Sequence, residues 1–243
     1  MSEFSIRGYR ALLHALRDAG YRFAAFEEPA SGPAEAPVVL LRHDVEVDLA
    51  AAAMLAECEA HEGVRSTYFI SPNTPFFNVL SGAAEHTISR IAQFGHTIGL
   101  HVDLLTAGGQ PNTLLRDVRP LTYLLPFVNT RLISVHSPPA ISAALTEQYP
   151  PLEPVYGPIL RGEVQYISDS TGRWRTTPPL MAPAFAERRP IHLLTHPVWW
   201  CYGGRRATDK LLAALERLVE DRRTTIREYF PKLTKADADL QPD

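Results

Sequence analysis

Residues 37–48 read PVVLLRHDVEVD, and this stretch decides the fold. The four apolar residues at 38–41 are typical of a strand buried on both faces, as in a parallel sheet covered by helices. The strand runs directly into charged side chains, which are costly to bury unless they are paired or bind a metal. Asp44 and Glu46 point to the same side of an extended chain, so they can share a cation or divide into a ligand and a base. The alternative is a solvated strand end in which Arg42 pairs with an acid.

The composition narrows the class of protein. The chain has 243 residues, 45% of them hydrophobic, which is enough for one α/β domain or barrel. The net charge is -3 with both signs interspersed, so nothing favours nucleic acid or an anionic membrane as a partner. No apolar run approaches a membrane span, and the N-terminus lacks a signal-peptide pattern. We expect one domain over 1–243 in the cytoplasm, including an N-terminal helix at 4–20 and a polar tail at 232–243.

Helical and extended patterns alternate along the chain. Apolar runs predict strands at 37–41, 66–70, 96–100, 131–135, 164–167 and 191–195. Helical spacing predicts further helices at 49–62, 83–94, 113–126 and 207–228. Residues 150–190 are expected to be irregular apart from one strand. This alternation predicts an α/β fold with mostly parallel strands.

Acids and imidazoles follow five of these strands. They are Asp44 with Glu46, His101, His136, Asp169 and His196. In parallel sheets and α/β barrels the active site lies at the carboxyl ends of the strands, so we expect these side chains at one rim. Histidine and carboxylate ligands without thiolates suit Zn²⁺ or a similar divalent metal. A metal site beside a further carboxylate and imidazole is equipped to hydrolyse an amide or an ester.

Four motifs carry a family resemblance. LLRHDVEVD, RSTYFI, GHTIGLHVD and LLTHP together resemble the polysaccharide deacetylases of the NodB-homology class, carbohydrate esterase family 4. The RHDVD-type members associated with bacterial surface-sugar and lipopolysaccharide synthesis are the nearest in pattern. The resemblance covers about residues 37–200. It implies a distorted, TIM-like (β/α) barrel, one divalent metal, with zinc favoured, and removal of an acyl group from an N-acylated sugar or glycan.

The resemblance also assigns roles to single residues. Asp44 takes the place of the catalytic base, and His196 in LLTHP takes that of the general acid. Glu46 stands where the family has a second, metal-binding acid, here as Glu instead of Asp. A second alignment makes Asp44 the ligand and puts His43 in the position of the base.

The metal ligands depart from the family pattern at one position. His101 corresponds to the first metal histidine, but Leu105 occupies the place of the second. His136 stands in place of the arginine of the R-x-P motif and is our candidate for the missing ligand. Asp103 is the runner-up.

Further residues are predicted to orient or contact the substrate. Asp169 and Trp174 resemble the motif that orients catalytic groups and supplies an aromatic wall. Trp199 and Trp200 are placed to stack on a sugar ring, and His43 either orients Asp44 or lines the pocket. Arg161 and Arg173 are candidates for contact with an anionic group of a substrate.

Two other functions remain open on the sequence alone. One is an allantoinase-like hydrolase that acts on a small ureide with the same fold. The other is an inactive, deacetylase-like protein that binds a glycan, and the loss of the histidine at Leu105 is the feature that favours it.

Overall fold

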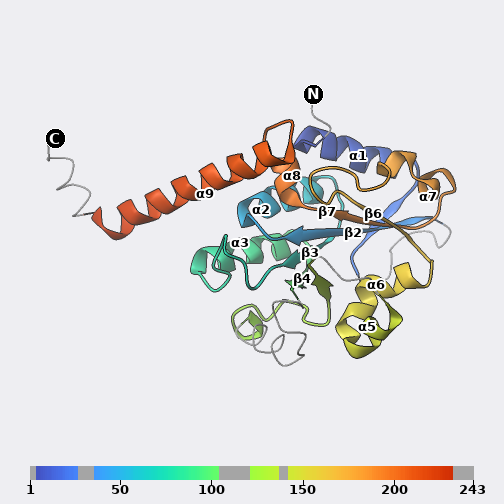
Figure 1. Ribbon diagram of the computed structural model, residues 1–243, viewed down its shortest axis with the longest axis horizontal. Helices are drawn as coiled ribbons and strands as arrows, with labels where there is room; N and C mark the ends of the chain where they lie inside the picture. Colours follow the sequence, from blue (N-terminus) through green and yellow to red (C-terminus); the bar gives the residue numbers. More distant parts are fainter. Residues whose placement is uncertain (1–3, 27–35, 104–120, 137–141, 232–243) are drawn as a thin grey trace.

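The computed structural model describes residues 4–26, 36–103, 121–136 and 142–231 (Figure 1). Its strands are β1 (Arg22–Ala24), β2 (Val38–Val45), β3 (Thr67–Ile70), β4 (Thr97–Val102), β5 (Ile133–Val135), β6 (Gln165–Ser168) and β7 (Ile191–Thr195). Its α-helices are α1 (Ile6–Asp18), α2 (Leu49–His61), α3 (Gly82–Gln93), α5 (Ala143–Gln148), α6 (Glu153–Leu160), α7 (Pro183–Ala186), α8 (Pro197–Cys201) and α9 (Ala207–Tyr229). Short 3₁₀ turns at Pro150–Leu152 and Pro179–Met181 complete the described elements.

The strands form one parallel sheet, as the sequence predicts. Its order is β5-β4-β3-β2-β7-β6, and β1 pairs with the first half of β2. Every pair of neighbouring strands is parallel. Parallel strands place their carboxyl ends at one edge, so the residues that follow β2, β4, β5, β6 and β7 share that edge. Because all seven strands belong to this sheet, we propose that the described elements form a single domain.

The sheet curls into a half-barrel with helices around it, which confirms the α/β class (Figure 1). Its concave side is filled by rings from several elements. Phe26 packs against Phe69 of β3 and His192 of β7, and Tyr166 of β6 also reaches His192. Tyr156 of α6 accepts a hydrogen bond at 2.9 Å from the amide of Val135 in β5. Helix α6 therefore lies at the open side of the arc, beside the end strand β5.

The helices begin and end close to where the sequence predicts. Ser5 caps α1 by accepting from the amide of Gly8, and Asp48 caps α2 by accepting from the amides of Ala50 and Ala51. Such caps satisfy amides that have no partner within the helix. Helix α9 begins on the body of the molecule and then runs away from it (Figure 1).

Three parts of the fold differ from the prediction or extend it. Strand β2 does not end at residue 41 but continues to Val45, so the charged residues belong to the strand itself. Residues 22–24, for which the sequence predicts no element, form β1, and the 150–190 region holds α6, β6, α7 and two 3₁₀ turns. The helix expected at 113–126 lies mostly outside the described residues.

Candidate active site

The alternation of side chains along β2 separates two groups of polar residues. Arg42, Asp44 and, just past the strand, Glu46 face a cavity at the carboxyl edge of the sheet. His43 points to the opposite face, toward α2. The cavity has a volume of about 1230 Å³. Its described walls also include His101, His136, His196, Trp174 and Trp199, which brings most of the predicted site residues to one place.

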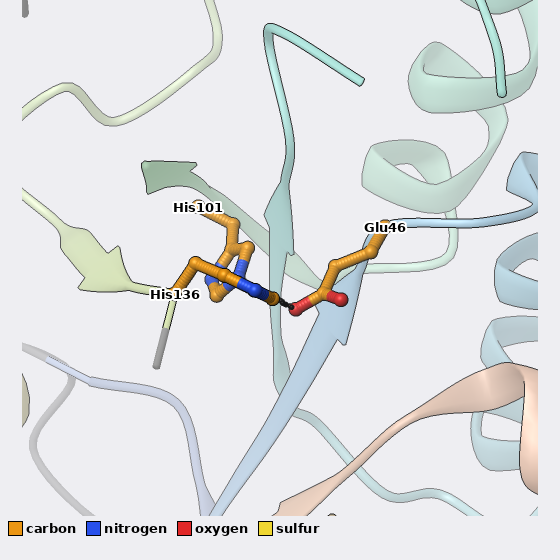
Figure 2. A group of neighbouring side chains, drawn as sticks. All are labelled: Glu46, His101 and His136. Carbon is orange, nitrogen blue, oxygen red and sulfur yellow. Dashed lines mark hydrogen bonds and ion pairs between the residues drawn. The ribbon is translucent and has the colours of Figure 1, made fainter. Parts of the chain in front are cut away.

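Three side chains converge at the rim from different strands. Figure 2 shows Glu46, His101 and His136 reaching toward one another from β2, β4 and the end of β5. Oε1 of Glu46 lies 2.7 Å from Nε2 of His101 and 3.0 Å from Nδ1 of His136. The two ring nitrogens are 3.4 Å apart. Burial favours the neutral form of Glu46, but the hydrogen bond from His101 outweighs this and lowers the pKa of Glu46 to about 2.

This trio fits a divalent metal. Ligand atoms bound tetrahedrally to zinc at about 2.0–2.1 Å lie roughly 3.4 Å from one another. The three separations of 2.7, 3.0 and 3.4 Å are at or just below that spacing, so a small outward movement of Glu46 would admit an ion. Two imidazoles and one carboxylate also form a donor set of the kind found in catalytic zinc sites that keep an open position.

A second layer of contacts orients His101. Its Nδ1 lies 2.7 Å from Oγ of Ser134 and 3.4 Å from Oδ2 of Asp44. The Ser134 hydroxyl donates to Oδ1 of Asp44 at 3.2 Å. Metal-binding histidines commonly use the second ring nitrogen in this way, which sets the tautomer and the ring orientation. Nε2 of His101 is thereby left to face Glu46 and the cavity.

Asp44 is held by its neighbour on the same face of β2. Arg42 donates from Nε at 2.8 Å and from Nη2 at 2.7 Å to the two carboxylate oxygens of Asp44. The rings of Phe69 and Tyr156 each lie 5.3 Å from the guanidinium carbon. Burial alone would raise the pKa of Asp44, but the charge of Arg42 outweighs it, and the net pKa lies well below the usual range. Arg42 therefore favours the ionised form of Asp44.

His196 and Asp169 form a second pair beside the metal site. Nδ1 of His196 lies 2.7 Å from Oδ1 of Asp169, whose carboxylate also accepts from the His196 amide and from Nε1 of Trp200. Burial favours neutral His196, but the hydrogen bond to Asp169 dominates, and the pKa of His196 is raised. One ligand-type atom from each of Asp44, Glu46 and His196 lies within 4.8 Å of the others. An imidazole therefore lies close to both carboxylates.

Of the predicted aromatic site residues, some line the cavity and one packs in the core. Trp174 and Trp199 line the cavity, in agreement with their predicted place. Trp200 does not, because its ring is buried against Phe4, Tyr9 and Trp174 while its indole nitrogen donates to Asp169. The expectation that Trp200 stacks on a sugar is therefore wrong. Its hydrogen bond to Asp169 instead fixes the carboxylate that also contacts His196.

The place of His43 is also corrected. Its ring is fully buried away from the cavity, with Nδ1 2.7 Å from Oγ1 of Thr195 and Nε2 2.7 Å from Oε1 of Glu59 in α2. His43 therefore neither lines the pocket nor reaches Asp44, which excludes the alignment in which it is the base. The physical reason is the alternation of the strand, which puts residue 43 on the face opposite to residues 42 and 44.

The structure does not bring the remaining predicted residues of the described chain into the ligand groups or the cavity wall. Asp103 is in neither of the two candidate ligand groups found among the described residues. Leu105 lies outside the described residues. Arg161 is exposed and pairs with Glu153 and Glu163, so it is not a cavity residue.

Sequence reasoning missed three supporting residues. Arg42 was considered only as the partner of an acid at a solvated strand end, although it shares a face with Asp44 by the period of two. Ser134 and Tyr156 gave no signal, because a serine in a short strand and a tyrosine in a helix are common in any core. Their roles follow only from the contacts with Asp44 and Arg42.

Comparison with known proteins returns deacetylases. No protein-family model matches the chain, and no curated protein matches it. Among solved structures, the chain is similar to the chitin deacetylase of the fungal pathogen Colletotrichum lindemuthianum, with 17% identity and a TM-score of 0.43 over 76% of this chain and 84% of that one. It is also similar to a peptidoglycan deacetylase of Bdellovibrio bacteriovorus, with 17% identity and a TM-score of 0.43 over 84% of this chain and 53% of the other. A family 4 carbohydrate esterase from Bacillus anthracis follows, with 13% identity and a TM-score of 0.38 over 87% and 86% of the two chains.

These proteins are of the class that the sequence motifs resemble. A membrane-spanning helix is not found in the part of the chain that the structure describes, since no helix there is both long and apolar enough.

Proposed function

We propose that this protein is a metal-dependent hydrolase that removes an N-acyl group, acetyl or formyl, from a sugar or sugar conjugate. It would act as a member of the NodB-homology class in the synthesis of a bacterial surface polysaccharide. The observation that carries this proposal is the meeting of Glu46, His101 and His136 beside two further groups, the buried Asp44 and the Asp169–His196 pair. A ligand set, a base and an acid thus face one cavity.

The contacts of each residue suggest its role in the reaction. Glu46, His101 and His136 would hold a divalent metal, which when bound polarises a carbonyl and lowers the pKa of water. Asp44, which Arg42 favours in its ionised form, accepts the proton of the attacking water at lone pairs not used by Arg42 and Ser134. The bond to Asp169 raises the pKa of His196 and so favours the protonated imidazole, which donates its proton to the departing amine.

Metal content is the first test of this proposal. The purified protein should hold one equivalent of zinc or a related divalent ion, measured by inductively coupled plasma spectrometry after zinc loading and desalting. The variant His136→Gln should lose most of it. The control His86→Gln removes an exposed histidine of α3 far from the ligand set and should keep it. Wild-type protein that takes up no divalent metal would contradict the proposal.

Activity on a panel of substrates is the second test. Acetate or formate release is measured with N-acetylated and N-formylated sugars, with small ureides as the competing class. Turnover of an N-acyl sugar is expected, and Asp44→Asn should reduce it by about 10²–10⁴-fold because the general base is lost. Turnover of ureides alone, or an Asp44→Asn variant with undiminished activity, contradicts the assignment.

A further inference from the structure

Two arginines in the wall of the active-site cavity have no acidic partner among the residues that the structure describes. Arg173 and Arg175 are exposed side chains that line the cavity together with Trp174. Within the described residues no carboxylate lies at ion-pair distance from either guanidinium. Three other exposed arginines, Arg161, Arg189 and Arg206, each pair with a nearby acid. Two adjacent positive charges are thus kept unneutralised beside the catalytic groups.

The segment that carries these arginines, residues 170–175, is anchored to the general-acid pair. The amide of Gly172 donates to the carbonyl of Asp169 at 3.0 Å, and the amide of Arg175 donates to the carbonyl of Ser168 at 2.9 Å. The hydroxyls of Ser168 and Ser170 are 2.6 Å apart. The backbone of the segment therefore holds a defined position relative to Asp169 and His196.

The same segment stores backbone strain. Thr171 has φ 68°, in the left-handed region that a β-branched residue rarely adopts because it is strained there. Gly172 follows with φ 73°, and a Cβ there would lie 2.7 Å from Cβ of Ala207, the first residue of α9. Strain of this kind persists where the surroundings hold it, which is common at ligand clamps. Here the surroundings are the start of α9 and the end of β6.

The charges in the cavity are arranged in two zones. At the ligand set, Asp44 is neutralised by Arg42, and Glu46 faces two imidazoles. In the other zone, the two free arginines lie with Ala207 and Thr208 in the first turn of α9, where the helix dipole adds positive potential. The acid of that turn, Asp209, is already bound to Arg206. The second zone therefore attracts an anion, although the chain as a whole has a net charge of -3.

The volume of the cavity leaves room for such a group. At about 1230 Å³ it exceeds the range of roughly 300–1,000 Å³ typical of sites for drug-sized ligands. A single N-acyl hexose fills only part of it. Trp174 stands between the two arginines in the sequence and offers an aromatic face on which a sugar ring can stack.

We propose that the N-acylated sugar taken by this site carries an anionic group, a phosphate or a carboxylate, which Arg173 and Arg175 bind while Trp174 contacts the sugar. The sugar part of this inference rests on the proposed function, whereas the anion site stands on the two arginines. Arginine is the side chain best suited to such groups, because its planar fork matches phosphate and carboxylate oxygens.

Substrate preference tests the inference. Rates are compared for neutral N-acetylglucosamine oligomers, N-acetylglucosamine 1-phosphate, UDP-N-acetylglucosamine and an N-acetylated uronic acid. At least one anionic substrate should exceed the neutral ones in kcat/KM by about tenfold or more, and the series shows whether phosphate or carboxylate is preferred. In the double variant Arg173→Gln/Arg175→Gln, KM for that substrate should rise by about 10- to 100-fold while kcat is retained.

A matched control removes the same charge elsewhere. Arg217 and Arg223 lie on α9 outside the cavity. The double variant Arg217→Gln/Arg223→Gln should therefore leave the preference for anionic substrates unchanged. Equal kcat/KM for neutral and anionic substrates, or a preference that survives the loss of Arg173 and Arg175, would overturn the inference.

A binding measurement separates this inference from the proposed function. If no substrate is hydrolysed, isothermal titration with UDP and with N-acetylglucosamine 1-phosphate still tests the anion site. Binding to the wild type that weakens about tenfold or more in the Arg173/Arg175 variant, but not in the α9 control, supports the site even when hydrolysis fails. No binding to the wild type, or equal binding to the variant, overturns it.

Discussion

Arg42 and Asp44 are two residues apart in the chain and form an ion pair that is almost wholly buried. Only 1% of Arg42 and 4% of Asp44 is exposed. Taking two charges out of water is costly, and the cost is met here by two aligned hydrogen bonds and by the rings on either side of the guanidinium. The position of Asp44 is therefore set by Arg42 more than by the strand alone. A lysine cannot reproduce this fork.

The variant Arg42→Lys tests that dependence. It keeps a positive charge but loses the two parallel bonds and the stacking, so kcat should fall by about 10- to 100-fold while the fold is retained. Circular dichroism checks the fold and acyl release measures the rate. Arg65→Lys, at an exposed arginine that bonds the carbonyl of Gly95, is the control. Full activity of Arg42→Lys would show that Asp44 needs no such support.

The pH profile tests His196. Because Asp169 raises the pKa of His196 above its ordinary 6.5, activity should decline as the pH rises through that elevated pKa. In Asp169→Asn the raising contact is lost, so the alkaline limb of log kcat against pH should move to lower pH. Glu187→Gln, at an exposed acid outside the cavity, serves as the control. An alkaline limb that does not move in Asp169→Asn would remove His196 from the role of acid.

At the scale of elements, α2 is joined to the sheet by one buried carboxylate. Glu59 is wholly buried and accepts hydrogen bonds from the hydroxyls of Tyr9, Ser66 and Tyr68, and His43 lies 2.7 Å away. The network links α1, α2, β2 and β3 on the face of the sheet opposite to the cavity. Burial would raise the pKa of Glu59, but His43 outweighs it, and the net value falls to about 2.

This network predicts a sensitivity to acid. A lowered pKa contributes stability that is present above the unfolded-state value of 4.5 and is lost as the pH falls from there toward about 2. Glu59→Gln should lower the free energy of unfolding at pH 7 by about 2–4 kcal/mol and flatten its fall in acid. Urea titrations at pH 7, 4.5 and 3 measure both effects. Glu57→Gln, on the exposed side of α2, should change neither by more than about 0.5 kcal/mol.

At the scale of the whole molecule, the proposed metal ligands come from three strands. Glu46 follows β2, His101 lies in β4 and His136 follows β5, with 90 residues of sequence between the first and the last. An unfolded chain cannot bring these groups together, so the free energy of metal binding adds to the stability of the folded sheet. The half-barrel and its metal site should therefore unfold as one unit.

Zinc should accordingly raise the melting temperature. A ligand at about 1,000 times its Kd stabilises a protein by about 4 kcal/mol when it binds only the folded state. Differential scanning fluorimetry with zinc and with a chelator measures the shift. His136→Gln should abolish most of it, and His86→Gln should preserve it. A melting temperature that is the same with zinc and with chelator would contradict a coupled metal site.

The amino-acid sequence by itself determined most of the helices and strands, and the edge of the sheet at which the reactive side chains lie. Apolar runs and helical spacing are local properties, so they predicted the parallel sheet and the approximate bounds of several helices. Residues that directly follow parallel strands must share an edge, so Glu46, His136, Asp169 and His196 were expected together before any contact was known. The departure at Leu105 was equally visible, because the family that the motifs resemble has a histidine at that position.

Only the tertiary structure decided which partner each polar group finds. The strand continues through Arg42 and Asp44, so one is bound to the other, while His43 turns toward Glu59 in a different element. Trp200 packs in the core, whereas Trp199 lines the cavity. These outcomes depend on the packing of segments far apart in the chain. Local periodicity gives the face on which a side chain lies, but it carries no information about what covers that face.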